Sequence, residues 1–194
     1  ISGNKLSLSV GGVRAYNHEN LYSKKTEERF KVFIGFKNWV CTNLCISTDG
    51  IITDLRVRTI EELAQGIISL IRDFNIQKEI FSLSNFMKYN ITENQFAQLI
   101  GKSKMYQYLP THLKKELFEF PLVDSQVSTI TKDYYHDKSF CRNDNGDINL
   151  WKLYNLFTSA NKSSYIDTFL ERGKNCYEFT NIIAKNLENK HFWY

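Results

Sequence analysis

The stretch that decides the fold class runs from residue 51 to residue 74 and reads IITDLRVRTIEELAQGIISLIRDF. Its first part, Ile51–Val57, follows the turn dipeptide Asp49-Gly50 and is typical of a strand entered from a hairpin. From Thr59 the pattern changes, because Thr59-Ile60-Glu61-Glu62 matches a helical capping box. Apolar residues then recur at helical spacing, at Ile60, Leu63, Ala64, Ile67, Ile71 and Phe74. The chain is therefore expected to change from strand to helix near residue 58.

The residues before this point favour an antiparallel sheet. Lys5–Val10 alternates apolar and polar residues until Gly11-Gly12, and Arg29–Phe36 alternates again. Trp39–Ile46 is a third candidate strand, which would place Asn43 between two cysteines on one face. We expect a small twisted sheet with one face that needs cover.

The residues after this point favour helices. Apolar spacing and capping signals predict them around Ile80–Met87, Thr92–Ile100, Gln126–Tyr135, Leu150–Ala160 and Tyr165–Asn189. The sequence therefore predicts a single α+β domain over residues 1–194, mainly β in 1–58 and mainly α in 59–194. Because the chain begins at Ile1 without Met, we also expect it to be a fragment of a longer chain.

Composition excludes several classes of protein. The 194 residues are 42% hydrophobic and 24% charged, which does not fit a disordered or collagen-like chain. The net charge of +4 is too small for a dedicated polycation, and the four cysteines are too sparse for a disulfide scaffold. The sequence has no apolar run near the length of a membrane span. We expect a cytoplasmic protein without a membrane partner.

Cys41 and Cys45 suggest a metal or redox pair at first. In a strand they would lie on one face but roughly 13 Å apart, too far for one zinc ion or one disulfide. We therefore expect structural thiols; the alternative is a site that remote ligands complete.

Residues 143–147, NDNGD, resemble part of a calcium loop. With Gly146 at the sixth position, the first and twelfth would be Cys141 and Lys152, where calcium needs carboxylates. We expect a turn instead, with Asp147 capping the next helix.

Ile91–Met105 resembles a helix-turn-helix in its spacing of Ala97 and Gly101. Pro110 would fall inside the recognition helix and break it, so an ordinary helix that ends at Gly101 is favoured.

The best binding signal lies between Asn94 and Lys115, where the sequence has no acidic residue. The residues expected to bind nucleic acid are Lys102, Lys104, Tyr106, Tyr108, Lys114 and Lys115. Lysines that neutralise phosphates beside rings that stack on bases form a single-strand platform. The other interpretation is a solvated surface with half-buried tyrosines. We expect a non-enzymatic protein that binds single-stranded or duplex nucleic acid.

Two other function classes remain open. The terminal aromatic residues His191–Tyr194 favour a protein-interaction or oligomerisation module, such as a homodimer, if they are displayed rather than packed. A hydrolase or nuclease site near His136 would need Asp133 and Asp137 to converge on the imidazole. Because the known catalytic and cofactor motifs are missing, we expect no catalytic residue, metal or cofactor.

Two segments resemble a family of bacterial proteins of unknown function that is associated with phages and plasmids, in its Bacteroidetes branch. The first comprises Ser9–Ala15 and Phe33–Leu44, where the family has a strand ending in Val-Cys-Thr-Asn. The second is Leu150–Thr158, which is similar to the family's Trp-x-x-Tyr/Phe-Asn-x-x-Thr helix. The resemblance implies a mobile-element protein with no established activity and no catalytic residues to carry over.

The asparagines of both motifs are candidates for the fold as well as for a site, since buried asparagines must be hydrogen-bonded. If the motifs converge on one groove, we expect Arg14, Asn43, Trp151 and Asn155 to be the first contacts of a ligand.

Overall fold

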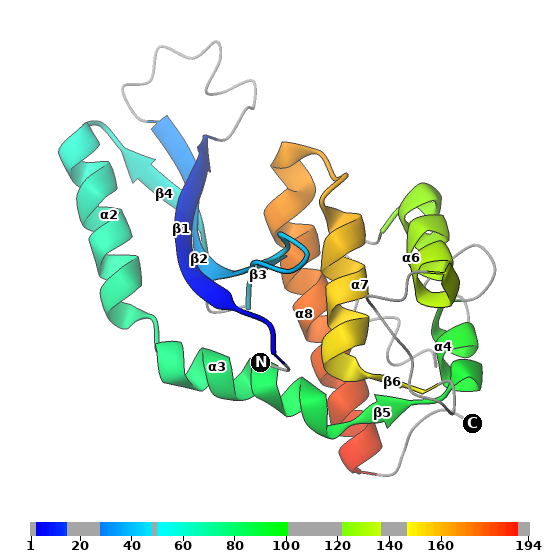
Figure 1. The fold of residues 1–194 in the computed structure, drawn as a ribbon. Coiled ribbons are helices and arrows are strands. Elements are labelled where there is room, and N and C mark those ends of the chain that lie inside the picture. The colour runs from blue at the N-terminus through cyan, green and yellow to red at the C-terminus, as the bar shows by residue number, and fades with distance from the viewer. Residues whose placement is uncertain (1–2, 15–27, 48–49, 101–121, 137–146, 190–194) are drawn as a thin grey trace.

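The computed structural model describes residues 3–14, 28–47, 50–100, 122–136 and 147–189 (Figure 1). Its strands are β1 (Leu6–Arg14), β2 (Glu28–Asn38), β3 (Leu44–Cys45), β4 (Ile51–Val57), β5 (Asn90–Ile91) and β6 (Ile148–Asn149). Its helices are α2 (Ile60–Asp73), α3 (Ile76–Asn85), the 3₁₀ turn η2 (Phe86–Lys88), α4 (Glu93–Ile100), α6 (Asp124–His136), α7 (Leu150–Asn161) and α8 (Ile166–Glu188). The predicted α+β class is confirmed.

Strand β2 is the centre of the main sheet. Along one edge it pairs with the whole of β1, from Leu6 opposite Asn38 to Arg14 opposite Phe30. Strands β3 and β4 also pair with β2 in the antiparallel direction. Because β1 already occupies the first edge, both of them lie along the other edge. Between them the chain passes over Gly35, where a Cβ atom would lie 2.6 Å from the Cys45 carbonyl oxygen. Only glycine permits that approach.

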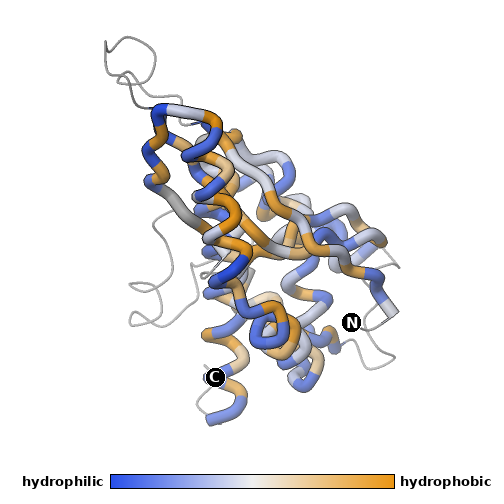
Figure 2. The backbone as a smooth tube through the Cα atoms, turned by 90° about the vertical axis from the view of Figure 1, so that its left-hand side faces the viewer, coloured by the Kyte–Doolittle hydropathy of each residue, from blue (hydrophilic) through white to orange (hydrophobic). Residues whose placement is uncertain are grey.

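One face of the main sheet is apolar and is covered by helices. The alternation along β2 puts Val32, Ile34 and Phe36 on one face, and all three are buried. The end of α2 packs on this face, with the rings of Phe36 and Phe74 6.4 Å apart. In Figure 1 strands β1 to β4 lie between α2 on one side and α7 and α8 on the other. Figure 2 shows the same arrangement by hydropathy, with hydrophobic stretches on the central strands and mixed colours on the outer helices.

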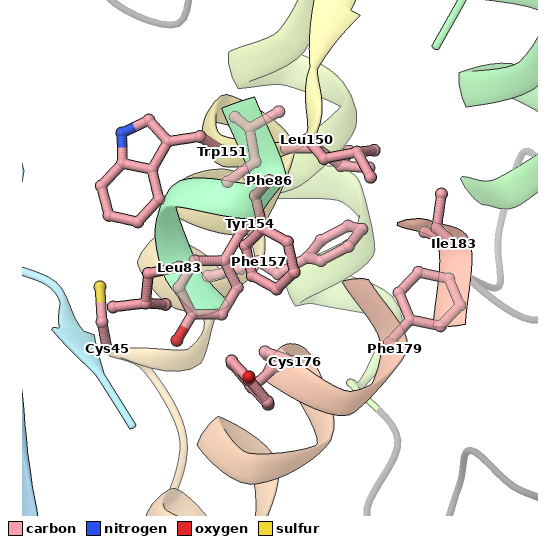
Figure 3. Close-up of a cluster of buried hydrophobic side chains, with 14 of the residues drawn as sticks. Cys45, Leu83, Phe86, Leu150, Trp151, Tyr154, Phe157, Cys176, Phe179 and Ile183 are labelled. Atoms are coloured by element: carbon pink, nitrogen blue, oxygen red, sulfur yellow. The ribbon is translucent and has the colours of Figure 1, made fainter. Parts of the chain in front are cut away.

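The largest part of the core surrounds α7 (Figure 3). This helix buries nearly every side chain it carries, including Trp151, Tyr154 and Phe157. Its aromatic rings pack against rings of η2 and α8. The ring centres of Tyr154 and Phe86 of η2 are 5.4 Å apart, and those of Phe157 and Phe179 of α8 are 5.3 Å apart. A helix buried on all sides needs partners for its polar residues, and α7 carries Asn155 and Thr158.

The predicted helix starts are largely confirmed. The Thr59 hydroxyl accepts a hydrogen bond from the Glu62 amide (3.2 Å), and the Thr92 hydroxyl accepts one from the Gln95 amide (3.2 Å). The expected cap of α7 was wrong: its N-cap is Asn149, whose Oδ1 accepts from the Lys152 amide (2.9 Å). Strand β6, which pairs with β5, occupies Ile148 and Asn149, so the helix starts at Leu150, three residues after Asp147.

The predicted strand Trp39–Ile46 was largely wrong. Only Leu44 and Cys45 pair with β2, and the preceding residues form a turn closed by the Asn38 amide donating to the Asn43 carbonyl (2.9 Å). Thr42 adopts a left-handed φ of 57° in this turn, which is unusual for a β-branched residue.

The predicted apolar stripe of α2 is only partly buried. Leu63 and Ile67 pack against the core, whereas Ile60 is 80% exposed and Ile71 42% exposed. The helix rests on β4 through Gly66, where a Cβ atom would lie 2.7 Å from the Leu55 side chain, so its outer edge faces away from the sheet. No helix in the described part of the chain has the length and apolar character needed to cross a membrane.

Candidate functional site

The two motif segments meet where the β2–β3 turn docks on α7. Asn43 Nδ2 donates to the Asn155 carbonyl (2.9 Å) and to Thr158 Oγ1 (3.0 Å). Asn38 Nδ2 donates to Asn155 Oδ1 (2.9 Å). We call residues Asn38–Asn43 the Trp39 turn. Its two ends are therefore fixed to one face of α7 by side chains that are almost fully buried.

Further hydrogen bonds fix the middle of the Trp39 turn. The Cys41 thiol donates to Asn155 Oδ1 (3.3 Å), and Lys162 Nζ donates to the Cys41 carbonyl (2.8 Å). Burial raises the pKa of the Cys41 thiol, which keeps it in the protonated form that can donate. Asn155 in turn donates from Nδ2 to the Trp151 carbonyl (2.8 Å), which orients its amide. The polar network thus connects the turn to α7 at its middle as well as at its two ends.

The Trp39 turn displays two apolar side chains to solvent. Trp39 is 53% exposed and Val40 is 65% exposed. Trp39 Nε1 donates to Ser7 Oγ (3.0 Å), and the Trp39 amide donates to the Lys5 carbonyl (2.9 Å). Lys37 Nζ lies 4.8 Å from the centre of the Trp39 ring, a cation–π distance. The ring is thus held in place while much of it stays open to solvent.

The surroundings of the Trp39 turn are basic. Residues 4–14, 30–47 and 148–166, which build and support it, contain no Asp or Glu. Lys37 and Lys162 contact the turn through their ammonium groups, and Lys5 contacts it through its backbone carbonyl. By contrast, Lys31 forms an ion pair with Glu171 of α8, and Arg14 forms one with Glu28 (2.7 Å). The charge beside Trp39 is therefore positive and locally uncompensated by acidic residues of these segments.

Of the four residues expected to share a groove, three lie together. Asn43, in the Trp39 turn, and Trp151 and Asn155, on α7, are 0%, 1% and 3% exposed, so all three are buried where the turn meets the helix. Arg14 lies at the far end of β1, eight residues from Leu6, or roughly 26 Å along the strand.

The other candidate residues fall mostly outside the described part of the chain. That applies to Lys102, Lys104, Tyr106, Tyr108, Lys114 and Lys115, and also to His191–Tyr194 and Asp137. His136 is the exposed last residue of α6, and Asp133 lies one turn before it.

The cysteines of the core lie in apolar surroundings (Figure 3). Cys41, Cys45 and Cys176 are free thiols. Burial raises the pKa of the Cys45 thiol far above its ordinary value, and it raises the pKa of the Cys176 thiol to about 12. Protonated thiols are poor nucleophiles and poor metal ligands. Among the described residues no group of three His, Cys, Asp or Glu side chains could hold a metal ion.

Sequence reasoning missed Trp39 as an exposed residue. The segment was interpreted as a strand, in which Trp39 would have been an ordinary member of one face. The signal that could have found it is the pair of asparagines, Asn38 and Asn43, which bracket it at the spacing of a tight hairpin turn.

Comparison with protein-family models gives a match that covers the whole chain. The model of the family described as "Domain of unknown function, B. Theta Gene description (DUF3871)" matches residues 1–194. The chain therefore belongs to this family of unknown function. Comparisons with curated proteins and with solved structures give no match.

Proposed function

We propose that the protein is a non-enzymatic nucleic-acid-binding accessory protein of a mobile genetic element, and that it stacks bases on Trp39. The observation that carries the proposal is the exposed Trp39 ring, anchored through Ser7 Oγ and the Lys5 carbonyl, with the Lys37 ammonium 4.8 Å from its centre. The mobile-element setting comes from the family resemblance, and the binding chemistry comes from the Trp39 turn.

A preorganised ring is well suited to stacking. An aromatic side chain that is already ordered loses little conformational entropy when a base stacks on it. Every base has a π face, so such a contact tolerates sequence, while nearby ammonium groups neutralise the phosphates. A single strand can turn a base onto the ring, whereas a duplex keeps its bases stacked inside. The Trp39 turn therefore favours single-stranded DNA or RNA.

The basic segment that includes Lys102–Lys115 belongs to the same proposal. Its lysines and tyrosines would extend the contact along the strand, adding phosphate neutralisation to the stacking on Trp39.

The direct test is fluorescence polarisation with labelled single-stranded DNA, single-stranded RNA and duplex DNA at low salt. We expect both single strands to bind more tightly than duplex. Trp39→Ala should weaken single-strand binding by about 1–3 kcal/mol, roughly 5- to 150-fold. Lys37→Gln should lower the dependence of log K on log salt by about 0.7. Lys114→Glu combined with Lys115→Glu should weaken binding independently.

The chain offers a matched control for Trp39. Phe81 on α3 is 69% exposed, and Lys88 Nζ lies 5.3 Å from its ring centre, so it too is an exposed aromatic beside a lysine. Phe81→Ala should leave binding unchanged. Absence of binding at micromolar protein, or an equal loss in both aromatic variants, would contradict stacking on Trp39. Circular dichroism of each variant checks that the fold is retained.

A further inference from the structure

The outer edge of β1 presents an ordered row of backbone groups. The Trp39 amide donates to the Lys5 carbonyl, so the backbone of Lys5 faces β2. In an antiparallel ladder the direction alternates with each residue, and the β1–β2 register is continuous from Leu6 to Arg14. The N–H and C=O groups of Leu6, Leu8, Val10, Gly12 and Arg14 therefore point away from β2. No strand that the structure describes pairs with them.

This edge lacks the features that usually prevent strand pairing. Between Leu6 and Val13 the strand has no charged residue and no proline, and its register with β2 shows no bulge. Leu8 and Val10, which project from one face, are 41% and 38% exposed. An edge of eight uncharged residues with exposed apolar side chains is a template for another strand.

We propose that the occupant of this edge is β1 of a second copy of the same chain, paired antiparallel about a twofold axis at Ser9. In this register Leu8 lies opposite the partner's Val10, and Val10 lies opposite the partner's Leu8. All four have backbone groups that point into the new ladder. Ser9 faces the partner's Ser9 as a non-hydrogen-bonded pair. The two sheets become one continuous sheet.

The absence of charge favours a second copy as the occupant, and the small contact area makes its binding weak. Two uncharged strands meet without like-charge repulsion, and Arg14 is already neutralised by Glu28 at the strand end. A single pair of strands buries less than the roughly 1,200 Å² at the low end of stable interfaces. The dimer should therefore dissociate in the micromolar range, and a charged peptide is the less favoured occupant.

The test is sedimentation velocity of the full chain from low micromolar to several hundred micromolar protein. We expect a concentration-dependent monomer–dimer equilibrium that Leu8→Lys with Val10→Lys abolishes. The matched control is Ile76→Lys with Ile80→Lys on α3, where the side chains are 40% and 41% exposed and the added charge is the same. The control should dimerise as the unmodified chain does.

Cysteine crosslinking tests the register separately. Residues of a non-hydrogen-bonded pair have Cα atoms about 4.5 Å apart, within disulfide range, so Ser9→Cys should form an intermolecular disulfide on oxidation. Ser7→Cys, offset by four residues from its symmetry mate, should crosslink no more than the unmodified chain. A monomer at every concentration, a dimer dissociated by the α3 control, or preferential crosslinking through Ser7→Cys would overturn the proposal.

Discussion

Asn155 shows how a single side chain can fix a surface that it does not reach. Its Oδ1 accepts from Asn38 and from Cys41, and its Nδ2 donates to the Trp151 carbonyl. Each bond joins α7 to itself or to the Trp39 turn. A buried amide that satisfies several partners gives little net stability for each bond, but leaving any partner unsatisfied is costly. The asparagines therefore specify the turn more than they strengthen the fold.

Removing one asparagine should expose that cost. In Asn43→Ala, Thr158 Oγ1 loses the Asn43 donor in a fully buried position, and the Asn155 carbonyl loses one of its donors while it still accepts from Thr158 Oγ1 (3.3 Å). We expect the free energy of unfolding to fall by about 2–3 kcal/mol, measured by urea denaturation. Asn94→Ala, at an exposed position of α4, should change it by less than about 0.5 kcal/mol. Equal effects in the two variants would mean that the network does not hold the turn.

The buried thiols predict a loss of stability at alkaline pH. The pKa of Cys176 is raised by burial to about 12 from an ordinary value of 9.0. Above pH 9 the unfolded chain releases this proton while the folded chain keeps it, so stability falls as pH rises towards 12. Between pH 9.5 and 10.5, Cys176→Ala should lose stability less steeply than the unmodified chain, by about 1 kcal/mol per pH unit. Urea denaturation across this range measures both slopes, and parallel slopes would contradict the assignment.

Gly35 matters for a whole element, because the pairing of β3 with β2 depends on the absence of a side chain at this position. At Gly35 an added Cβ would meet the backbone of Cys45 at 2.6 Å, and a carbonyl in a ladder cannot move aside. Gly35→Ala should therefore lower the free energy of unfolding by at least about 2–3 kcal/mol in chemical denaturation. Gly12→Ala is the matched control on β1, because its nearest atom would be 3.5 Å away, an ordinary contact. A Gly35→Ala protein as stable as the unmodified chain would contradict the close approach of Cys45 to β2.

Whole elements were predictable where local signals agreed with the tertiary fold. Thr59 and Thr92 cap helices as their capping boxes predict, and the alternation of Arg29–Phe36 gives the central strand. The cap of α7 was not predictable in this way, because Asn149 takes that role only after β6 has paired with β5. Asp147 and Asn149 both carry side-chain acceptors, and the local sequence does not decide which of them caps the helix.

The Trp39 turn was not predictable from local propensity. Val40, Cys41 and Thr42 favour a strand, and a left-handed threonine is disfavoured on its own. The turn forms because Asn38 and Asn43 find partners on α7 more than a hundred residues later. The spacing of Asn38 and Asn43 hints at a turn, but strand propensity opposes it, and the long-range contacts with α7 decide between the two.

At the scale of the whole molecule, the two proposals concern different parts of the main sheet: the nucleic-acid proposal concerns one face, and the dimer proposal concerns the outer edge of β1. Ser7, Lys37 and Trp39 lie on one face of the sheet, since Ser7 pairs with Lys37 and residues alternate. Leu8 and Val10 lie on the other face. A twofold axis perpendicular to the sheet keeps faces unchanged, so a dimer would carry both Trp39 turns on one face. Lys5 of each copy would lie eight residues from that of the other, roughly 26 Å along the strands.

This geometry predicts how binding should depend on strand length if both proposals hold. An oligonucleotide of about 5 nucleotides reaches one Trp39 turn, whereas one of about 20 reaches both, so the second contact becomes intramolecular. At protein concentrations that favour the dimer, the longer strand should bind at least about tenfold more tightly per molecule. Leu8→Lys with Val10→Lys should remove this gain and leave the short strand's affinity unchanged or slightly higher, because the added charges are positive. Fluorescence polarisation with both lengths separates the causes: loss of all binding in Trp39→Ala concerns the stacking site, while loss of the length dependence alone concerns the β1 edge. A gain that survives the β1 variant would place the second contact within one chain instead.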